Sequence, residues 1–127
     1  ADELTDHRLV GFTDGPAKKL VSAGDGADHT FPPHRVAARV ICDDGASMRI
    51  ATKSGLGIGM NSLWNIHDDL HDGSLVRVLP SYHIADQSAI WLVYPKSNVL
   101  TAKVRVFIDF LIQEIGTPPV WEQHVSN

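Results

Sequence analysis

The alternation of strands and helices along the chain is the feature that most restricts its fold. Residues 35–42 alternate apolar side chains as a buried strand does, and residues 43–55 follow directly with helical spacing. Residues 17–24 fit either a helical turn or an edge strand, whereas the Gly, Asp and Pro content of residues 25–34 predicts a loop. Further strands are expected at residues 7–12, 56–60, 74–80 and 88–95, and further helices at residues 61–73 and 101–116. This order predicts an α/β fold with a largely parallel sheet flanked by helices.

The helix at residues 43–55 has recognisable ends. It is expected to begin at Asp43 or Asp44, because either carboxylate can accept the free N–H groups of the first turn. Gly55 is the expected stop, since glycine readily adopts the left-handed conformation that ends helices. The side chains expected to face the sheet are Ala46, Ile50, Ala51 and Ser54.

The helix at residues 61–73 raises the question of a metal site. His67 and His71 are four residues apart, so both imidazoles would share one helix face, as in zinc proteases. Asp68 replaces the usual glutamate with a shorter reach, and a third ligand would have to come from elsewhere. The pattern favours an ordinary polar helix end. This helix is expected to begin at Asn61 or Ser62, to face inward with Leu63, Ile66 and Leu70, and to end at Gly73.

The last helix, at residues 101–116, has an unusually broad apolar surface. Its helical stripe is widened by further large apolar side chains, so a second surface is needed to cover it. A partner chain or another part of the protein would serve, and we expect self-association through the face carrying Val106 and Phe110. The stripe consists of Val104, Phe107, Ile108, Leu111 and Ile115, and Val106, Phe110 and Ile112 widen it.

Composition excludes several classes of function. The net charge is −4 and the lysines and arginines are scattered singly, which argues against a nucleic-acid interface in this segment. The single cysteine, Cys42, excludes an internal disulfide framework and a cysteine-rich zinc module. No apolar run approaches the ~20 residues of a membrane span, and the N-terminus lacks the features of a signal peptide. Because the sequence does not begin with methionine, we expect a piece of a longer chain.

Two further motifs favour structural roles over chemistry. Gly55 and Gly57 begin a pattern like a dinucleotide-binding fingerprint, but Met60 occupies the third glycine position and a helix precedes the motif. The glycines instead predict a tight helix-to-strand connection. Cys42 precedes two aspartates, which would raise the pKa of its thiol and so disfavour a nucleophilic role.

Four segments, taken in order, resemble one protein family. They are DELTDHRLVGF, the stretch from RVAARVIC to GMNSLW, DLHDGSLVRVLP, and the stretch from SAIWLVYP to FIDFLIQE. Their order and spacing resemble the effector-binding domain of LysR-type transcriptional regulators over residues 2–115. The resemblance implies a Rossmann-like subdomain of a type-2 periplasmic-binding-protein fold. It makes residues 1–87 the second effector-binding subdomain, residues 88–116 a crossover strand and helix of the first subdomain, and residues 117–127 a tail.

The resemblance also implies a function. The parent protein would be a cytoplasmic bacterial transcription regulator rather than an enzyme, and this chain would sense a small-molecule effector such as a carboxylate or an aromatic metabolite. It implies a homo-oligomer, contact with DNA only through an N-terminal helix-turn-helix absent from this chain, and no membrane contact, cofactor, metal or catalytic residue. The alternatives are a soluble periplasmic solute-binding protein and a metal-dependent enzyme using His67 and His71.

The effector is expected at the carboxyl ends of parallel strands, near helix N-termini. Carried over from the resemblance, the effector-binding residues are Phe12, Thr13, Asp43, Asp44 and Ser47. Ser47 and the free N–H groups of its turn could hold an anion. Asp43 and Asp44 act in the opposite direction, because they repel a carboxylate and favour a ligand with donor groups. The residue pattern leaves this conflict open.

Overall fold

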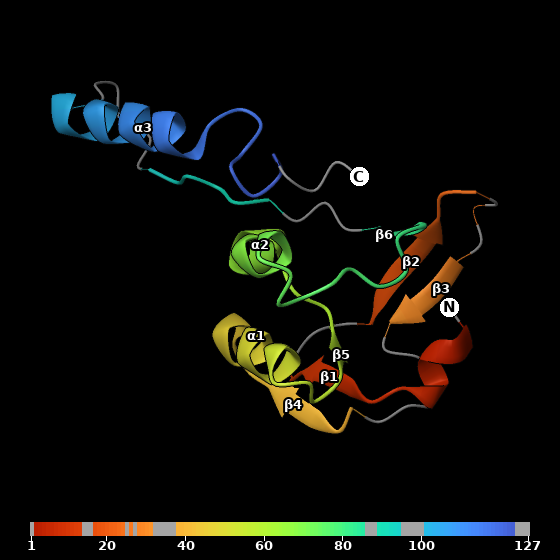
Figure 1. Ribbon diagram of the computed structural model, residues 1–127. Coiled ribbons are helices and arrows are strands. Elements are labelled where there is room, and N and C mark those ends of the chain that lie inside the picture. The colour runs from red at the N-terminus through yellow and green to blue at the C-terminus, as the bar shows by residue number, and fades with distance from the viewer. Residues whose placement is uncertain are drawn as a thin grey trace. The chain divides into compact units, whose positions relative to one another are not determined.

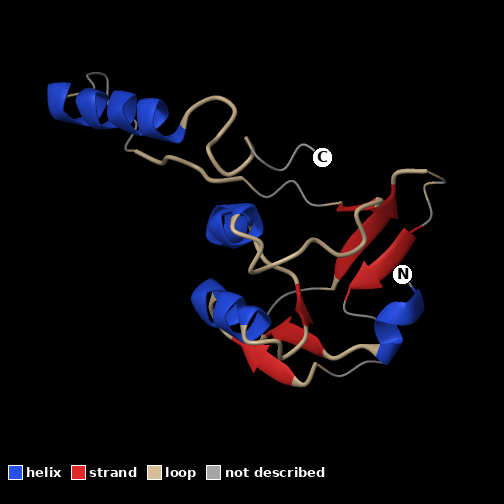
Figure 2. Cartoon of the chain, viewed as in Figure 1, coloured by secondary structure: helices blue, strands red, loops and turns tan. Residues whose placement is uncertain are grey.

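The computed structural model describes residues 2–13, 17–24, 26, 28–31, 38–85, 89–94 and 101–123 (Figure 1). Contacts divide the chain into two compact units, residues 1–87 and residues 88–127. The first unit contains two short sheets and two α-helices, and the second contains a single described α-helix (Figure 2). The predicted α/β class with a parallel sheet and flanking helices is confirmed.

The parallel sheet has three strands in the order β4-β1-β5. The central strand β1 (Leu9–Phe12) pairs with β4 (Val40–Cys42) on one side and with β5 (Ile58–Gly59) on the other. Helix α1 (Gly45–Lys53) contacts all three strands and helix α2 (Leu63–His71). Strand β4 is shorter than the predicted strand at residues 35–42, of which residues 35–37 lie outside the described residues.

A second sheet, which is antiparallel, was not expected from the sequence. Strand β2 (Lys18–Ser22) lies between β3 (Asp28–Phe31) and β6 (Tyr82–Ile84). The ambiguous segment at residues 17–24 is therefore a strand, and the prediction of a loop across residues 25–34 was wrong for Asp28–Phe31. The strand predicted at residues 74–80 was also wrong, because this segment is irregular, with bends and a final turn leading to β6. Strand formation here depends on pairing with β2, which local residue patterns do not report.

Two apolar clusters lie on opposite faces of β1, since successive side chains of a strand point in opposite directions. Leu9 belongs to a cluster with Leu4 of the 3₁₀ helix η1 (Asp2–Asp6) and with two residues of the antiparallel sheet. Val10 belongs to a cluster with side chains of β4 and α1. Leu9 and Val10 are fully buried. The remaining members are Leu20 and Phe31 of the first cluster and Cys42, Met48 and Ala51 of the second.

Helix α1 begins and ends as expected but turns a different face inward. Asp44 is the N-cap residue and Gly55, with φ of 73°, follows the C-cap. The side chains buried against the sheet are Met48 and Ala51. The predicted stripe was wrong at Ile50, which is 65% exposed, and at Ala46, which is also exposed. Of the other two predicted residues, Ala51 is buried as expected, whereas Ser54 is exposed.

Helix α2 differs more strongly from the expectation. Its predicted inward residues, Leu63, Ile66 and Leu70, are only half-buried, and the buried member of the helix is Asp69. The Asp69 carboxylate accepts hydrogen bonds from the guanidinium of Arg49 and from Lys53 Nζ at 2.7 Å. An ion-paired acid, rather than an apolar stripe, therefore joins α2 to α1. Ser62 is its N-cap, and Gly73, with φ of 77°, follows its last turn as predicted.

The glycines between α1 and α2 allow close packing of backbone. A Cβ added at Gly57 would lie 2.5 Å from the carbonyl oxygen of Arg8, and one added at Gly59 would lie 2.6 Å from Thr52 Oγ1. Both distances are too short for any side chain. The tight connection predicted for this segment is confirmed, and its purpose is to let β5 approach β1 and α1.

The second unit contains helix α3 (Ala102–Ile115), close to the predicted bounds. Its apolar face is open: within the described residues Phe107 is 56% exposed and Val106 is 68% exposed. Residues 89–94, part of a predicted strand at residues 88–95, form no strand and are exposed. A strand needs a neighbouring strand to satisfy its backbone groups, and the described part of this unit supplies none.

Candidate functional site

The carboxyl ends of β1, β4 and β5 meet at one edge of the parallel sheet. Thr13, which follows β1, donates hydrogen bonds from its N–H (2.8 Å) and its hydroxyl (3.0 Å) to the carbonyl oxygen of Cys42 at the end of β4. The first turn of α1 and the segment leading into α2 begin at the same edge. This is the edge where parallel sheets commonly bind ligands.

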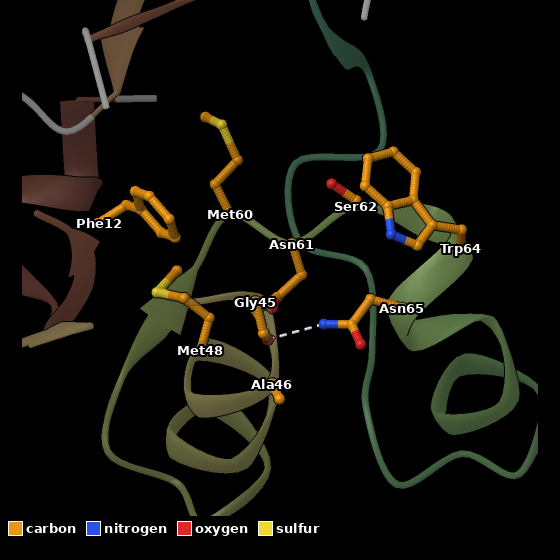
Figure 3. A pocket seen from close by; sticks show the side chains of 9 residues that line it. All are labelled: Phe12, Gly45, Ala46, Met48, Met60, Asn61, Ser62, Trp64 and Asn65. Atoms are coloured by element: carbon orange, nitrogen blue, oxygen red, sulfur yellow. Dashed lines mark hydrogen bonds between the residues drawn. The ribbon is translucent and has the colours of Figure 1, made fainter. Parts of the chain in front are cut away.

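A pocket of about 320 Å³ opens beside this edge (Figure 3). The end of β1 contributes Phe12, the start of α1 contributes small residues and Met48, and the segment from β5 into α2 contributes the remainder. Its apolar part consists of two methionines and two aromatic rings, and its polar part of two amides and a hydroxyl. The lining residues are Phe12, Gly45, Ala46, Met48, Met60, Asn61, Ser62, Trp64 and Asn65. None of these nine residues carries a charge.

The two amides of the pocket are held by the protein itself. Asn65 Nδ2 donates to the carbonyl oxygen of Gly45 at 2.7 Å, the contact drawn in Figure 3. Asn61 Nδ2 donates to Thr52 Oγ1 at 3.2 Å, and the Thr52 hydroxyl donates in turn to the carbonyl of Met48 at 2.8 Å. Because the Thr52 proton is used in that second bond, Thr52 can only accept from Asn61, which fixes the orientation of the amide. Among the described residues, Asn61 Oδ1 is then buried without a hydrogen-bond partner.

The start of α1 already holds a carboxylate. Asp44 accepts hydrogen bonds from the Ser47 N–H, at 2.9 Å, and from the Ser47 hydroxyl. These bonds, that of the hydroxyl first, lower the pKa of the Asp44 carboxyl below its ordinary value, so Asp44 is charged at neutral pH. The Ser47 N–H and hydroxyl, which were considered as donors to an anion, thus already donate to a carboxylate of the same chain.

The cap can be tested by replacing Asp44 with alanine. We expect the melting temperature to fall by about 4 °C, because the first turn loses its acceptor for the Ser47 N–H. Asp44→Asn is the matched control, since an amide oxygen preserves that acceptor while the charge is removed. Thermal melts followed by circular dichroism measure both. Equal melting temperatures for the two variants would show that charge, not capping, is the contribution of Asp44.

The structure brings only part of the predicted site together. Phe12 lines the pocket and is 47% exposed. Thr13, Asp43, Asp44 and Ser47 lie at the same edge of the sheet but do not line the pocket. Thr13 links two strand ends, and Asp44 and Ser47 cap α1.

Sequence reasoning missed the contribution of the third strand end. Met60, Asn61, Ser62, Trp64 and Asn65 follow β5, and all of them line the pocket. The signal was present, since a strand at residues 56–60 followed by a helix at residues 61–73 had been predicted. Its carboxyl end qualifies as a ligand position by the same rule that places the effector at the ends of β1 and β4.

The helix with the two histidines does not assemble a metal site within the described residues. No group of three or more His, Cys, Asp or Glu side chains there is placed to hold a metal ion. His67 Nε2 lies 3.4 Å from Asp68 Oδ1, a neighbour on its own helix.

Of the helices in the described ranges, none combines the length and apolar character that a membrane span requires.

Comparison with known proteins agrees with this architecture. The regulatory domain of AphB from Vibrio vulnificus superposes with a TM-score of 0.71 and 30% identity, over 89% of this chain and 54% of that one. Full-length AphB from Vibrio cholerae, described as a virulence activator, superposes with a TM-score of 0.65 and 26% identity, over 88% of this chain and 37% of that one.

Sequence relatives point in the same direction. The HTH-type transcriptional regulator CrgA of Neisseria meningitidis is 26% identical over 116 residues, which are 91% of this chain and 38% of the relative. The HTH-type transcriptional activator TtdR of Escherichia coli is 38% identical over 68 residues, which are 50% of this chain and 21% of the relative. The chain thus spans well under half the length of these relatives. The family model for the LysR substrate binding domain matches residues 1–116, and the chain belongs to this family.

Proposed function

We propose that this chain is the effector-sensing part of a bacterial transcription regulator, and that the pocket at the end of the parallel sheet is one wall of the effector site. The observation that carries the proposal is the position of the pocket, where the carboxyl ends of three parallel strands and the start of α1 come together. The match to the LysR substrate binding domain and the names of the relatives support it.

The assignment of residues to two subdomains is part of this proposal. Residues 1–87 form one effector-binding subdomain, and residues 88–116 belong to the other subdomain, followed by a tail. The division of contacts after residue 87 supports this assignment. The apolar surface of α3, open within the described residues, supports a role in contacts beyond this unit, either with that subdomain or in a homo-oligomer.

The regulatory step is a shift between conformations. An effector that contacts both subdomains stabilises their closed arrangement and thereby changes the placement of DNA-binding domains elsewhere in a cytoplasmic oligomer. Such a step needs binding groups at the site and no catalytic group. The uncharged lining of the pocket, with no nucleophile aligned with a base, supports binding rather than catalysis.

The proposal is tested with the full-length regulator and a DNA site selected from genomic fragments. A panel of aromatic and carboxylic metabolites is scanned by thermal shift, and compounds that raise the melting temperature are then tested for a change in DNA affinity by fluorescence anisotropy. We expect at least one compound to change both. Trp64→Ala, which removes the largest ring of the pocket, is expected to weaken the response roughly tenfold or more.

Val76→Ala is the matched control, because Val76 is 78% exposed and lies outside the pocket. It is expected to respond as the wild type does. Compounds that bind without changing DNA affinity, or a Trp64→Ala variant that responds normally, would contradict the proposal.

A further inference from the structure

We infer that this wall of the effector site receives an uncharged ring and selects against a carboxylate. The inference rests on the proposed function and goes beyond it by naming the chemistry of the group that enters the pocket. It is carried by three features of the described residues: the apolar lining of the pocket, the absence of a cation from that lining, and the acceptor and the negative charge beside it.

The apolar part of the pocket suits a flat ring. Phe12 and Trp64 offer aromatic surfaces, and Met48 and Met60 offer polarisable sulfur atoms that contact rings favourably (Figure 3). The volume of about 320 Å³ exceeds the roughly 150 Å³ at which a buried apolar cavity binds benzene. A single ring with one small substituent therefore fits.

The polar groups of the pocket are not arranged to hold an anion. A carboxylate taken out of water is costly without a compensating cation, and none of the nine lining residues is cationic. One N–H of each side-chain amide donates to a protein oxygen, Asn65 to Gly45 and Asn61 to Thr52, so at most one N–H of each amide is left for a ligand. The Ser47 N–H in the first turn of α1, which would otherwise attract an anion, donates to Asp44.

The remaining polar atoms near the pocket repel an anion. Asn61 Oδ1 is a buried acceptor without a donor among the described residues, so a second acceptor beside it is unfavourable. The charged Asp44 carboxylate directly precedes Gly45 and Ala46 of the lining. An effector that carries a carboxylate must therefore place that group away from this wall and its ring within it.

The two methionines make the inference directly testable. The sequence contains only Met48 and Met60, and both line the pocket, so methyl-labelled methionine reports on this site alone. The whole 127-residue chain is labelled with ¹³C-methyl methionine and titrated with benzamide and, separately, with benzoate. These probes share a ring and a planar substituent and differ in charge. Met48→Leu and Met60→Leu assign the two signals.

Benzamide is expected to shift the methyl signals with an affinity at least roughly tenfold higher than that of benzoate, because an uncompensated charge is costly in such a site. Trp64→Ala should abolish the shifts, and Ile50→Ala, an exposed position on α1 outside the pocket, should preserve them. The comparison of the two probes on the wild-type chain needs no variant, so it holds even where Trp64→Ala fails to fold.

Equal or tighter binding of benzoate would overturn the inference while leaving the proposed function intact, since the wall would still bind an effector group. Shifts from neither probe would also overturn it, because an uncharged ring would then have no site here. The proposed function is decided separately, by the response of the full-length regulator on DNA.

Discussion

Replacing Asp69 with asparagine is expected to lower the melting temperature at pH 7 by roughly 10 °C, the largest effect anticipated for a single side chain of this protein. Asp69 is 1% exposed, and its carboxylate holds the guanidinium of Arg49 and, at 2.7 Å, the ammonium of Lys53. The neutral amide of asparagine cannot balance the positive charges of these two side chains. The loss is limited because both cations are partly exposed and can turn toward water.

The pH dependence of the melting temperature tests the same interaction in a second way. Hydrogen bonds from Arg49, and secondarily from Lys53, hold the pKa of Asp69 well below its ordinary value. A carboxyl with a lowered pKa in the folded state contributes stability that is complete above its unfolded pKa of about 4 and is lost as the pH falls toward the folded pKa. The difference in melting temperature between wild type and Asp69→Asn should therefore be constant above about pH 5 and shrink between pH 4 and pH 2.

Asp68→Asn is the matched control, because Asp68 is the adjacent residue on the same helix and its side chain is 80% exposed. This variant is expected to melt within a degree or two of the wild type at pH 7, as surface substitutions commonly do. Equal melting temperatures for Asp69→Asn and the wild type, or a difference that does not change in acid, would show that the ion pairs do not stabilise the contact between α1 and α2.

Replacing Gly57 with alanine is expected to cost about 3 kcal/mol of the free energy of unfolding. The added Cβ would lie 2.5 Å from the carbonyl oxygen and 2.7 Å from the carbonyl carbon of Arg8. These are backbone atoms and cannot rotate away as a side chain would. The same carbonyl accepts the N–H of Ile58 at 2.8 Å, so relieving the clash breaks the pairing of β5 with β1.

Urea denaturation of this variant gives the free energy of unfolding from the midpoint and slope of the transition. Gly24→Ala is the control, since the nearest heavy atom to an added Cβ there is 4.0 Å away, an ordinary contact distance. It should unfold within about 0.5 kcal/mol of the wild type. A Gly57→Ala midpoint that matches the control would mean that β5 does not need its close approach to β1.

Local signals in the sequence located the helices and their ends well. Asp44 was one of the two residues expected to cap α1, and Gly55 and Gly73 were the expected stops, because capping and left-handed glycine depend on a few adjacent residues. The same reasoning failed for the antiparallel sheet. Strands β3 and β6 each pair with β2. Strand β3 follows β2 closely in the sequence, with Val21 opposite Asp28, but β6 is remote, with Leu20 opposite Ile84, and no local pattern reveals that pairing.

In the candidate site, too, local patterns predicted some residues correctly and long-range contacts decided the others. Phe12 was predicted and lines the pocket, whereas Asp44 and Ser47 satisfy each other at the helix start and leave the pocket to residues after β5. The end of α2 was predicted to be an ordinary polar helix end. In the structure Asp69 is buried there, and its ion pairs with Arg49 and Lys53 link α2 to α1. Such pairings depend on which faces of α1 and α2 meet.

The sequence by itself determined the α/β class, the positions of α1, α2 and α3, the ends of α1 and α2, and the resemblance to the LysR effector-binding domain, because each depends on periodicity, capping residues or motif order along the chain. Only the tertiary structure decided which side chains line the pocket and that the buried Asp69 forms ion pairs that join the two helices. These depend on distances between residues remote in the sequence, which are fixed only when the strands pair and the helices pack.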